Sequence, residues 1–225
     1  MKLARPDVRH PRIVLAGAIE DDDDDVGLVA ALRKRGLHAQ WMSWDAPATL
    51  DADLVILRAA PSDRLDEFLA WTKRVPNLLN APHVIEWNVD KRYLRDLQRA
   101  GVPTVTAAPG PDTTALVFLG GMQSHAFTGH QPVDADFGLW DVGYAALRAA
   151  ADKAGIEATE LLCARADVTG RPDDARLVRL DLVAPSLGWR VLDDTARGDR
   201  QRQFALCVES ALERLGLGPL SHRRP

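Results

Sequence analysis

Residues 88–105, NVDKRYLRDLQRAGVPTV, have the pattern of one complete amphipathic helix. Asn88 is a suitable N-cap, because its side chain can accept a hydrogen bond from an unpaired backbone amide. Apolar residues recur at helical spacing, and Gly101 followed by Pro103 marks the end of the helix. Lys91 would stand in the first turn, where the helix dipole disfavours a cation by roughly 0.3–1 kcal/mol. Either a bound anion or simple solvation would explain a lysine there.

The chain before this stretch alternates between short apolar runs and amphipathic segments. The runs predict strands, and the segments between them predict helices of about ten residues. Such alternation is typical of βαβ units around a parallel sheet, so we expect a small doubly wound α/β domain. The expected strands are Ile13–Ala18, His38–Trp44, Leu54–Leu57 and His83–Trp87, and the expected helices are Val26–Arg35 and Asp63–Arg74.

The pattern changes after residues 107–114, AAPGPDTT, which have the composition of a linker. Gly120-Gly121 between two apolar runs predicts a β-hairpin of Ala115–Leu119 with Gln123–Phe127. An alanine-rich helix is expected at Leu139–Ala154, and a final helix at about Asp199–Leu215. Between them, Thr159–Val168 and Ala175–Val183 predict two antiparallel strands. The second half is therefore expected to be α+β and antiparallel.

Composition and charge narrow the possible classes of function. The chain has 225 residues and a formal net charge of −4, so no general attraction to nucleic acid is expected. No apolar run reaches the roughly 18 residues of a membrane span, and no signal peptide is recognisable. Cys163 and Cys207 lie in apolar surroundings and are expected to be buried, reduced thiols. These features together predict a cytoplasmic location.

Two short patterns contain residue types that could bind a metal or carry out catalysis. The acidic run Asp21–Asp25 precedes an expected helix, where it would complement the helix dipole or bind a hard cation. Ser124 and His125 are adjacent, as are Ser221 and His222. Serine and histidine can act together as nucleophile and base, so an enzyme that uses a cleft for such chemistry is another possibility. Neighbours on a strand point to opposite faces, so we expect that Ser124 and His125 do not form a nucleophile–base pair.

Longer motifs resemble a known family. The run from Trp41 to Trp71, followed by residues 77–105, resembles the N-terminal half of bacterial ATP-grasp ligases. The group in question is related to the cyclo-ligase of cycloserine biosynthesis and to glutathione synthetase. LVFLGGMQSHAF, LLCARADV and RLDLVAPSL resemble strands of the C-terminal half, in the family's order. The resemblance implies a pre-ATP-grasp-like α/β domain at 1–106, a linker at 107–114 and an ATP-grasp-like subdomain at 115–225.

The resemblance also implies roles for single residues. Lys91 matches a phosphate-contacting lysine, and Arg165 matches an arginine near the transferred phosphate. Asp167 matches a magnesium ligand, and Asp181 falls where a second carboxylate ligand belongs. The implied cofactors are ATP and Mg²⁺, if a nucleotide site survives. The implied reaction makes an acyl phosphate, in which magnesium and cations offset the developing charge.

The sequence departs from the family at three places. Residues 106–114 stand where the family carries a whole subdomain with a second phosphate lysine and a glycine-rich flap. Arg179 and Ala184 replace family glutamates on the metal strand. Residues 58–63, RAAPSD, replace a tryptophan-containing segment.

These departures favour a degenerate ATP-grasp protein without ligase activity that acts as a binding or partner protein. The alternative is an active ATP- and Mg²⁺-dependent carboxylate–amine ligase with a shortened flap. The partners expected are a small carboxylate or amino-acid-like ligand and a second copy of the chain, with neither nucleic acid nor membrane.

Overall fold

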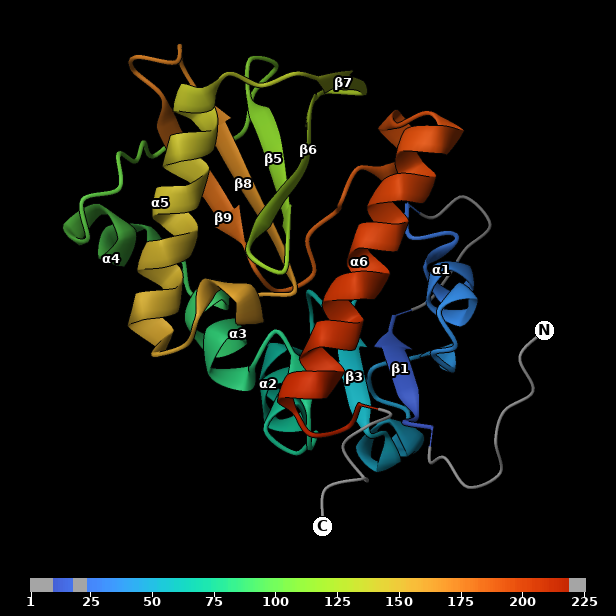
Figure 1. The fold of residues 1–225 in the computed structure, drawn as a ribbon. Coiled ribbons are helices and arrows are strands. Elements are labelled where there is room, and N and C mark those ends of the chain that lie inside the picture. The colour runs from blue at the N-terminus through green and yellow to red at the C-terminus, as the bar shows by residue number, and fades with distance from the viewer. Residues whose placement is uncertain (1–9, 18–23, 219–225) are drawn as a thin grey trace.

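The computed structural model describes residues 10–17 and 24–218, which form two β-sheets with helices around them (Figure 1). The first sheet is parallel throughout, with the strand order β2-β1-β3-β4. Its central strands β1 and β3 are entirely apolar and buried, as expected for strands covered on both faces. The bounds are β1 Ile13–Ala16, β2 Ala39–Met42, β3 Leu54–Leu57 and β4 Leu78–Leu79.

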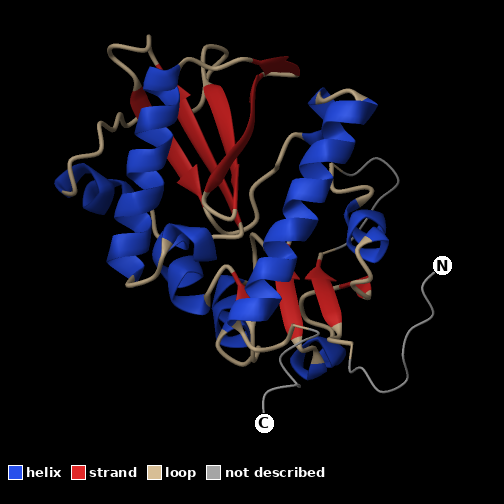
Figure 2. Cartoon of the chain, viewed as in Figure 1, coloured by secondary structure: helices blue, strands red, loops and turns tan. Residues whose placement is uncertain are grey.

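The second sheet is antiparallel, with the order β7-β6-β5-β8-β9. Its strands form a group separate from those of the parallel sheet (Figure 2). Gly120 and Gly121 connect β5 to β6, and both have positive φ angles. Thr104 adds a short parallel bridge to Leu177 at the β9 edge. The bounds are β5 Thr114–Leu119, β6 Met122–Thr128, β7 Gln131–Val133, β8 Cys163–Thr169 and β9 Arg176–Asp181.

Six α-helices and three short 3₁₀ turns are seen in the described part of the chain. Helix α5 covers one face of the antiparallel sheet, while α6 runs alongside α1 on the other side of the molecule (Figure 1). No helix among the described residues is long and apolar enough to cross a bilayer. The helices are α1 Leu28–Lys34, α2 Leu65–Thr72, α3 Pro82–Val89, α4 Tyr93–Arg99, α5 Phe137–Ala154 and α6 Asp194–Arg214, and the turns are Pro47–Asp51, Ala158–Glu160 and Trp189–Val191.

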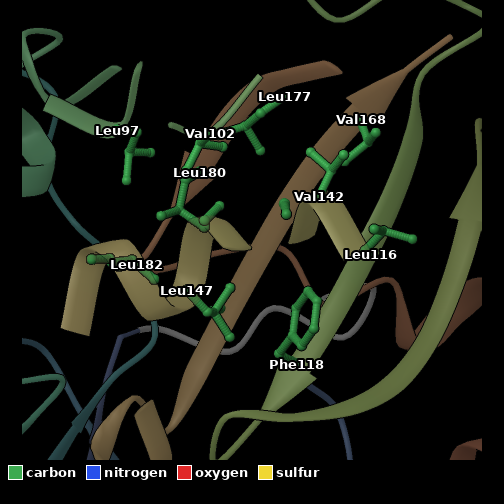
Figure 3. Packing of buried hydrophobic residues seen from close by; sticks show 14 of the residues in the cluster. Leu97, Val102, Leu116, Phe118, Val142, Leu147, Val168, Leu177, Leu180 and Leu182 are labelled. Carbon is green, nitrogen blue, oxygen red and sulfur yellow. The ribbon is translucent and has the colours of Figure 1, made fainter. Parts of the chain in front are cut away.

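The buried apolar side chains form three clusters. One lies between α5 and the antiparallel sheet and includes Phe118, Leu147 and Leu180 (Figure 3). A second joins both sheets through α6, because Leu15 of β1 and Val117 of β5 share it with Phe204. The third fills the opposite face of the parallel sheet. The two sheets are thus held together by a continuous apolar core.

The prediction of one helix over residues 88–105 is wrong. The structure has two helices, α3 ending at Val89 and α4 beginning at Tyr93. The predicted strand at His83–Trp87 is also wrong, since these residues lie within α3. Asn88 is not a cap: it lies inside α3, and its buried side chain binds the backbone of β9. The predicted end is confirmed, because Gly101 has φ 90° and closes the helix on Gln98.

The remaining expected elements are present with shifted ends. The parallel first half and the antiparallel second half are confirmed, as are the hairpin at Gly120-Gly121 and the alanine-rich helix ending at Gly155. The structure also has a short strand, β4, that was not among the expected elements. Residues 21–23 of the acidic run, Ser221 and His222 lie outside the described residues. The domain boundaries at 106 and 115 stay predictions.

Candidate functional site

Four charged side chains lie together on β8 and β9. Arg165 and Asp167 are two residues apart on β8, as are Arg179 and Asp181 on β9, so each pair shares one face of its strand. The strand register sets Arg165 opposite Asp181 and Asp167 opposite Arg179. Opposite charges therefore alternate around a square, which we call the charged square. The intervening residues face the core under α5.

Asp167 is the most deeply buried residue of the charged square. Its side chain is 0% exposed, and each of its oxygens accepts hydrogen bonds from a different arginine. Arg165 Nε donates to Oδ1 at 2.7 Å, and Arg179 Nε donates to Oδ2 at 2.8 Å. The Arg179 Nη2 atom lies 2.7 Å from the same oxygen. A buried carboxylate is tolerated only when it is paired in this way, so both arginines stabilise the charge on Asp167.

Arg165 and Arg179 differ in their surroundings. The Arg165 side chain is 18% exposed, and its guanidinium lies 5.0 Å from the centre of the Phe127 ring. Arg179 is 44% exposed and reaches Asp167 from the outer strand of the sheet. Arg165 is therefore fixed from two sides, by the carboxylate and by the ring, while Arg179 covers the carboxylate from solvent.

The charged square does not fit a divalent cation as it stands. Magnesium prefers carboxylate oxygens in octahedral geometry, yet both oxygens of Asp167 already bind guanidinium groups. One oxygen of Asp181 accepts the Val183 amide at 3.1 Å. No group of three or more acidic, histidine or cysteine side chains that could hold a metal is found within residues 10–17 and 24–218. Two arginines beside Asp167 would also repel the ion.

Lys91 lies apart from these contacts, in the bend between α3 and α4. It is exposed and makes no hydrogen bond or ion pair with any residue that the structure describes. The bend itself is docked on β9, because the Asn88 amide donates to the Leu180 carbonyl and the Tyr93 hydroxyl accepts the Leu180 amide. The structure thus brings Arg165, Asp167 and Asp181 together and places the Lys91 segment at the neighbouring strand edge without a contact to them.

Two buried asparagines connect the helical layer and the parallel sheet to β8 and β9. Asn80 donates to the Cys163 and Leu182 carbonyls at 2.9 and 2.7 Å and accepts the Leu162 amide. Asn88 accepts the Leu182 amide at 2.7 Å in addition to its bond to Leu180. Neither set of hydrogen bonds was predicted from the sequence. The feature that could have indicated them is an asparagine within an apolar run, in LLNAP for Asn80 and IEWNV for Asn88.

The acidic residues Asp24 and Asp25 bind protein groups. Arg58 donates to both oxygens of Asp25, at 2.8 and 3.0 Å, and to the Pro185 carbonyl. Burial opposes the charge of Arg58, but the attraction of Asp25 holds the Arg58 pKa above its ordinary value. Asp24 accepts the Gly188 amide at 2.7 Å. These carboxylates therefore hold the segment after β9 against the parallel sheet, and their side chains do not cap α1, which starts at Leu28. Among the described residues they belong to no group of three or more side chains that could hold a metal.

The reason given for expecting no nucleophile–base pair, that Ser124 and His125 point to opposite faces of the strand, is wrong. A β-bulge sets His125 opposite Val117 and Gln123 opposite Phe118, so Ser124 is the extra residue and the two side chains come together. Ser124 Oγ lies 3.1 Å from His125 Nδ1, and His125 Nε2 lies 2.6 Å from the Leu187 carbonyl. A carbonyl only accepts, so Nε2 carries the proton and Nδ1 accepts from the serine. Both residues are buried, which keeps the hydroxyl from solvent.

The whole fold is that of ATP-grasp proteins. A crystal structure of D-cycloserine synthetase DcsG superposes with a TM-score of 0.73 and 22% identity, over 89% of this chain and 99% of that chain. The RimK domain ATP-grasp protein of Sphaerobacter thermophilus gives a TM-score of 0.62 and 13% identity, over 88% and 99%. The macrocyclase MdnB of Microcystis aeruginosa gives the same TM-score and identity.

Sequence comparison adds a particular relative. Residues 9–80 match the family model described as the N-terminal domain of D-cycloserine synthetase DcsG. The chain is also 36% identical over 107 residues to the cycloserine biosynthesis protein DcsG of Streptomyces lavendulae. That match covers 43% of this chain and 36% of the relative, so it spans little more than a third of the relative's length. These matches relate part of the chain to DcsG, and the fold as a whole is like that of ATP-grasp proteins.

Proposed function

We propose that this chain is an ATP-grasp-related protein without ligase activity, which acts by binding a small ligand or a partner protein. The observation that carries the proposal is the pairing of both Asp167 oxygens with Arg165 and Arg179. ATP-dependent ligation needs magnesium between the phosphates, and a carboxylate already neutralised by two guanidinium groups offers it no free ligand.

Two further features support the proposal. Arg179 and Ala184 stand where the resemblance implies glutamates, so β9 and the segment after it keep Asp181 but lack two of the implied carboxylates, and Arg179 adds a competing cation. Residues 105–113 form a connection without helix or strand between the Thr104 bridge and β5. In the resemblance, a whole lysine-bearing subdomain belongs at this point. A nucleotide gripped between two subdomains would have protein on one side only.

A turnover assay tests the proposal directly. Purified protein with ATP, Mg²⁺ and a panel of amino acids is expected to release ADP and phosphate no faster than the Lys91→Ala variant does. Lys91 is exposed and without contacts in the described structure, so this substitution removes the implied phosphate contact without disturbing the fold. Steady turnover by the natural chain above that control would overturn the proposal.

The second candidate function is an active carboxylate–amine ligase that uses ATP and Mg²⁺. It is favoured by one observation, namely that Arg165, Asp167 and Asp181 lie on the same face of adjacent strands. For this function, bound magnesium would have to displace Arg179 from Asp167. Turnover that rises with Mg²⁺ in the assay above would support the ligase and remove the first proposal.

We also propose, as partners, a small carboxylate or amino-acid-like ligand and a second copy of the chain. The basis for a homodimer is apolar surface that a missing subdomain would otherwise cover. The described chain exposes several large apolar side chains, of which Phe137, Met122 and Val26 are the most exposed. Light scattering at micromolar concentration is expected to give the mass of a dimer, and a monomer mass would contradict it.

A further inference from the structure

A groove of about 520 Å³ lies between α1 and α6, two helices that run side by side (Figure 1). Its floor is made of small residues, so the two helices approach closely without filling the space between them. Gly27, which precedes α1, has φ 100°, and a Cβ there would lie 2.8 Å from Gln201 Oε1. The lining residues are Gly27, Ala30, Ala31, Lys34, Arg35, Gly198, Gln201 and Arg202.

Every charged residue that the structure places along this groove is basic. Lys34 and Arg35 come from the end of α1, and Arg202 comes from α6. Arg35 is held by an ion pair of 2.6 Å with Glu209, which lies outside the groove lining. Lys34 and Arg202 are exposed and make no side-chain hydrogen bond or ion pair with the described residues. In a chain of net charge −4, this is a local concentration of positive charge.

The groove between α4 and α5 provides a contrast. It is larger, at about 700 Å³, and also has basic residues at its rim. There, however, Asp96 lies within 3.3 Å of Arg99 and 3.6 Å of Lys153, and Asp152 adds a second carboxylate to the lining. Its charges are thus largely compensated by carboxylates of its own lining. The lining of the α1–α6 groove contains no carboxylate, and of its three cations Arg35 is paired, with Glu209, while Lys34 and Arg202 are not paired with any described residue.

We propose that the α1–α6 groove binds a small, multiply charged anion of the phosphate class. Lys34 and Arg202 would supply two flexible cations, Arg35 a third that is already positioned, and Ala30 and Ala31 an apolar floor for an organic portion. The volume lies within the range of ordinary small-molecule sites. Guanidinium groups bind phosphate oxygens through two parallel hydrogen bonds, which makes them well suited to this ligand. The site goes beyond the proposed function and does not depend on it.

Calorimetric titration of the full chain with inorganic pyrophosphate at low ionic strength, without Mg²⁺, tests this site. Saturable binding is expected for the natural chain. The Lys34→Gln/Arg202→Gln variant is expected to bind about tenfold or more weakly, because two charge-assisted contacts are lost. Both side chains are exposed, so the variant should keep its melting temperature.

The matched control is Arg95→Gln/Arg148→Gln, which changes the net charge equally on α4 and α5. It is expected to bind pyrophosphate as the natural chain does. Absence of saturable binding to the natural chain would overturn the proposal. Equal weakening in the control would also overturn it, since that would show a general charge effect. Tighter binding of duplex DNA than of pyrophosphate would overturn it in favour of a nucleic-acid surface.

Discussion

The surroundings of Asp167 depend on a residue of the neighbouring strand. The segment LLCARADV resembles a catalytic strand, and the strand places Arg165 and Asp167 on one face as that resemblance implies. The neighbouring strand places Arg179 opposite Asp167, at a position where the resemblance implies a glutamate. With Arg179 there, both oxygens of Asp167 accept hydrogen bonds from arginines. The presence of Arg179 was predictable from the sequence, but its bond to Asp167 required the register.

The protonation of His125 predicts how the stability of the fold depends on pH. Burial lowers the pKa of this imidazole to about 4, from an ordinary value of 6.5. The unfolded chain therefore takes up a proton more readily than the folded one. The stabilisation from neutral His125 is complete above about pH 6.5 and is lost as the pH falls towards 4. The loss should be about 3 kcal/mol, at 1.36 kcal/mol per pKa unit.

Urea unfolding at several pH values measures this effect as a difference between variants. His125→Gln is expected to be less stable at pH 7, but its stability should change less than that of the natural chain between pH 6.5 and 4. His130→Gln serves as the control, because His130 is exposed and its side chain makes no hydrogen bond or ion pair with the described residues. Parallel pH curves for the natural chain and His125→Gln would rule out this account of His125.

Helices and strands whose apolar residues recur with a clear period were predictable from the sequence. Contacts between residues far apart in the sequence were not. The strand β3 was expected at Leu54–Leu57 and is found there, because four buried apolar residues specify it. Residues 83–87 were expected as a strand because the run HVIEW is short and apolar, yet they lie within α3. A short apolar run does not by itself distinguish a strand from a buried helix, and α3 is held by contacts between distant residues, namely the hydrogen bonds of Asn88 to Leu180 and Leu182.

Asn88 should therefore contribute to stability out of proportion to its size. Asn88→Ala leaves the Leu180 carbonyl and the Leu182 amide without partners in the interior. The expected loss is roughly 2 kcal/mol or more, since each unsatisfied buried group costs about 1–3 kcal/mol. Thermal unfolding followed by circular dichroism should show a fall in melting temperature of several degrees.

The exposed Gln98→Ala on α4 is the matched control, and it is expected to leave the melting temperature unchanged. If Asn88→Ala also left it unchanged, the asparagine would not be what fastens α3 to β9. The bend that carries Lys91 would then owe its position to other contacts.

In the whole molecule, a parallel first half and an antiparallel second half were predictable from the sequence. The parallel half was predictable from alternating apolar runs and helices, and the antiparallel half from the hairpin at Gly120-Gly121. The junction between them was not predictable, because it depends on single polar contacts between distant residues. Asn80, Arg58 and Asp24 each join the N-terminal half to β8 or to the segment after β9. Such contacts have no periodicity in the sequence.

We propose that Asp167 pairs with Arg165 and Arg179 and does not hold Mg²⁺ for ATP. Calorimetric titration of the natural chain with ATP, with and without Mg²⁺, distinguishes the two states of Asp167. No Mg²⁺-dependent binding is expected at ATP concentrations up to the millimolar range. Mg²⁺-dependent binding of ATP tighter than millimolar, abolished by Asp167→Asn, would show that Asp167 holds the ion.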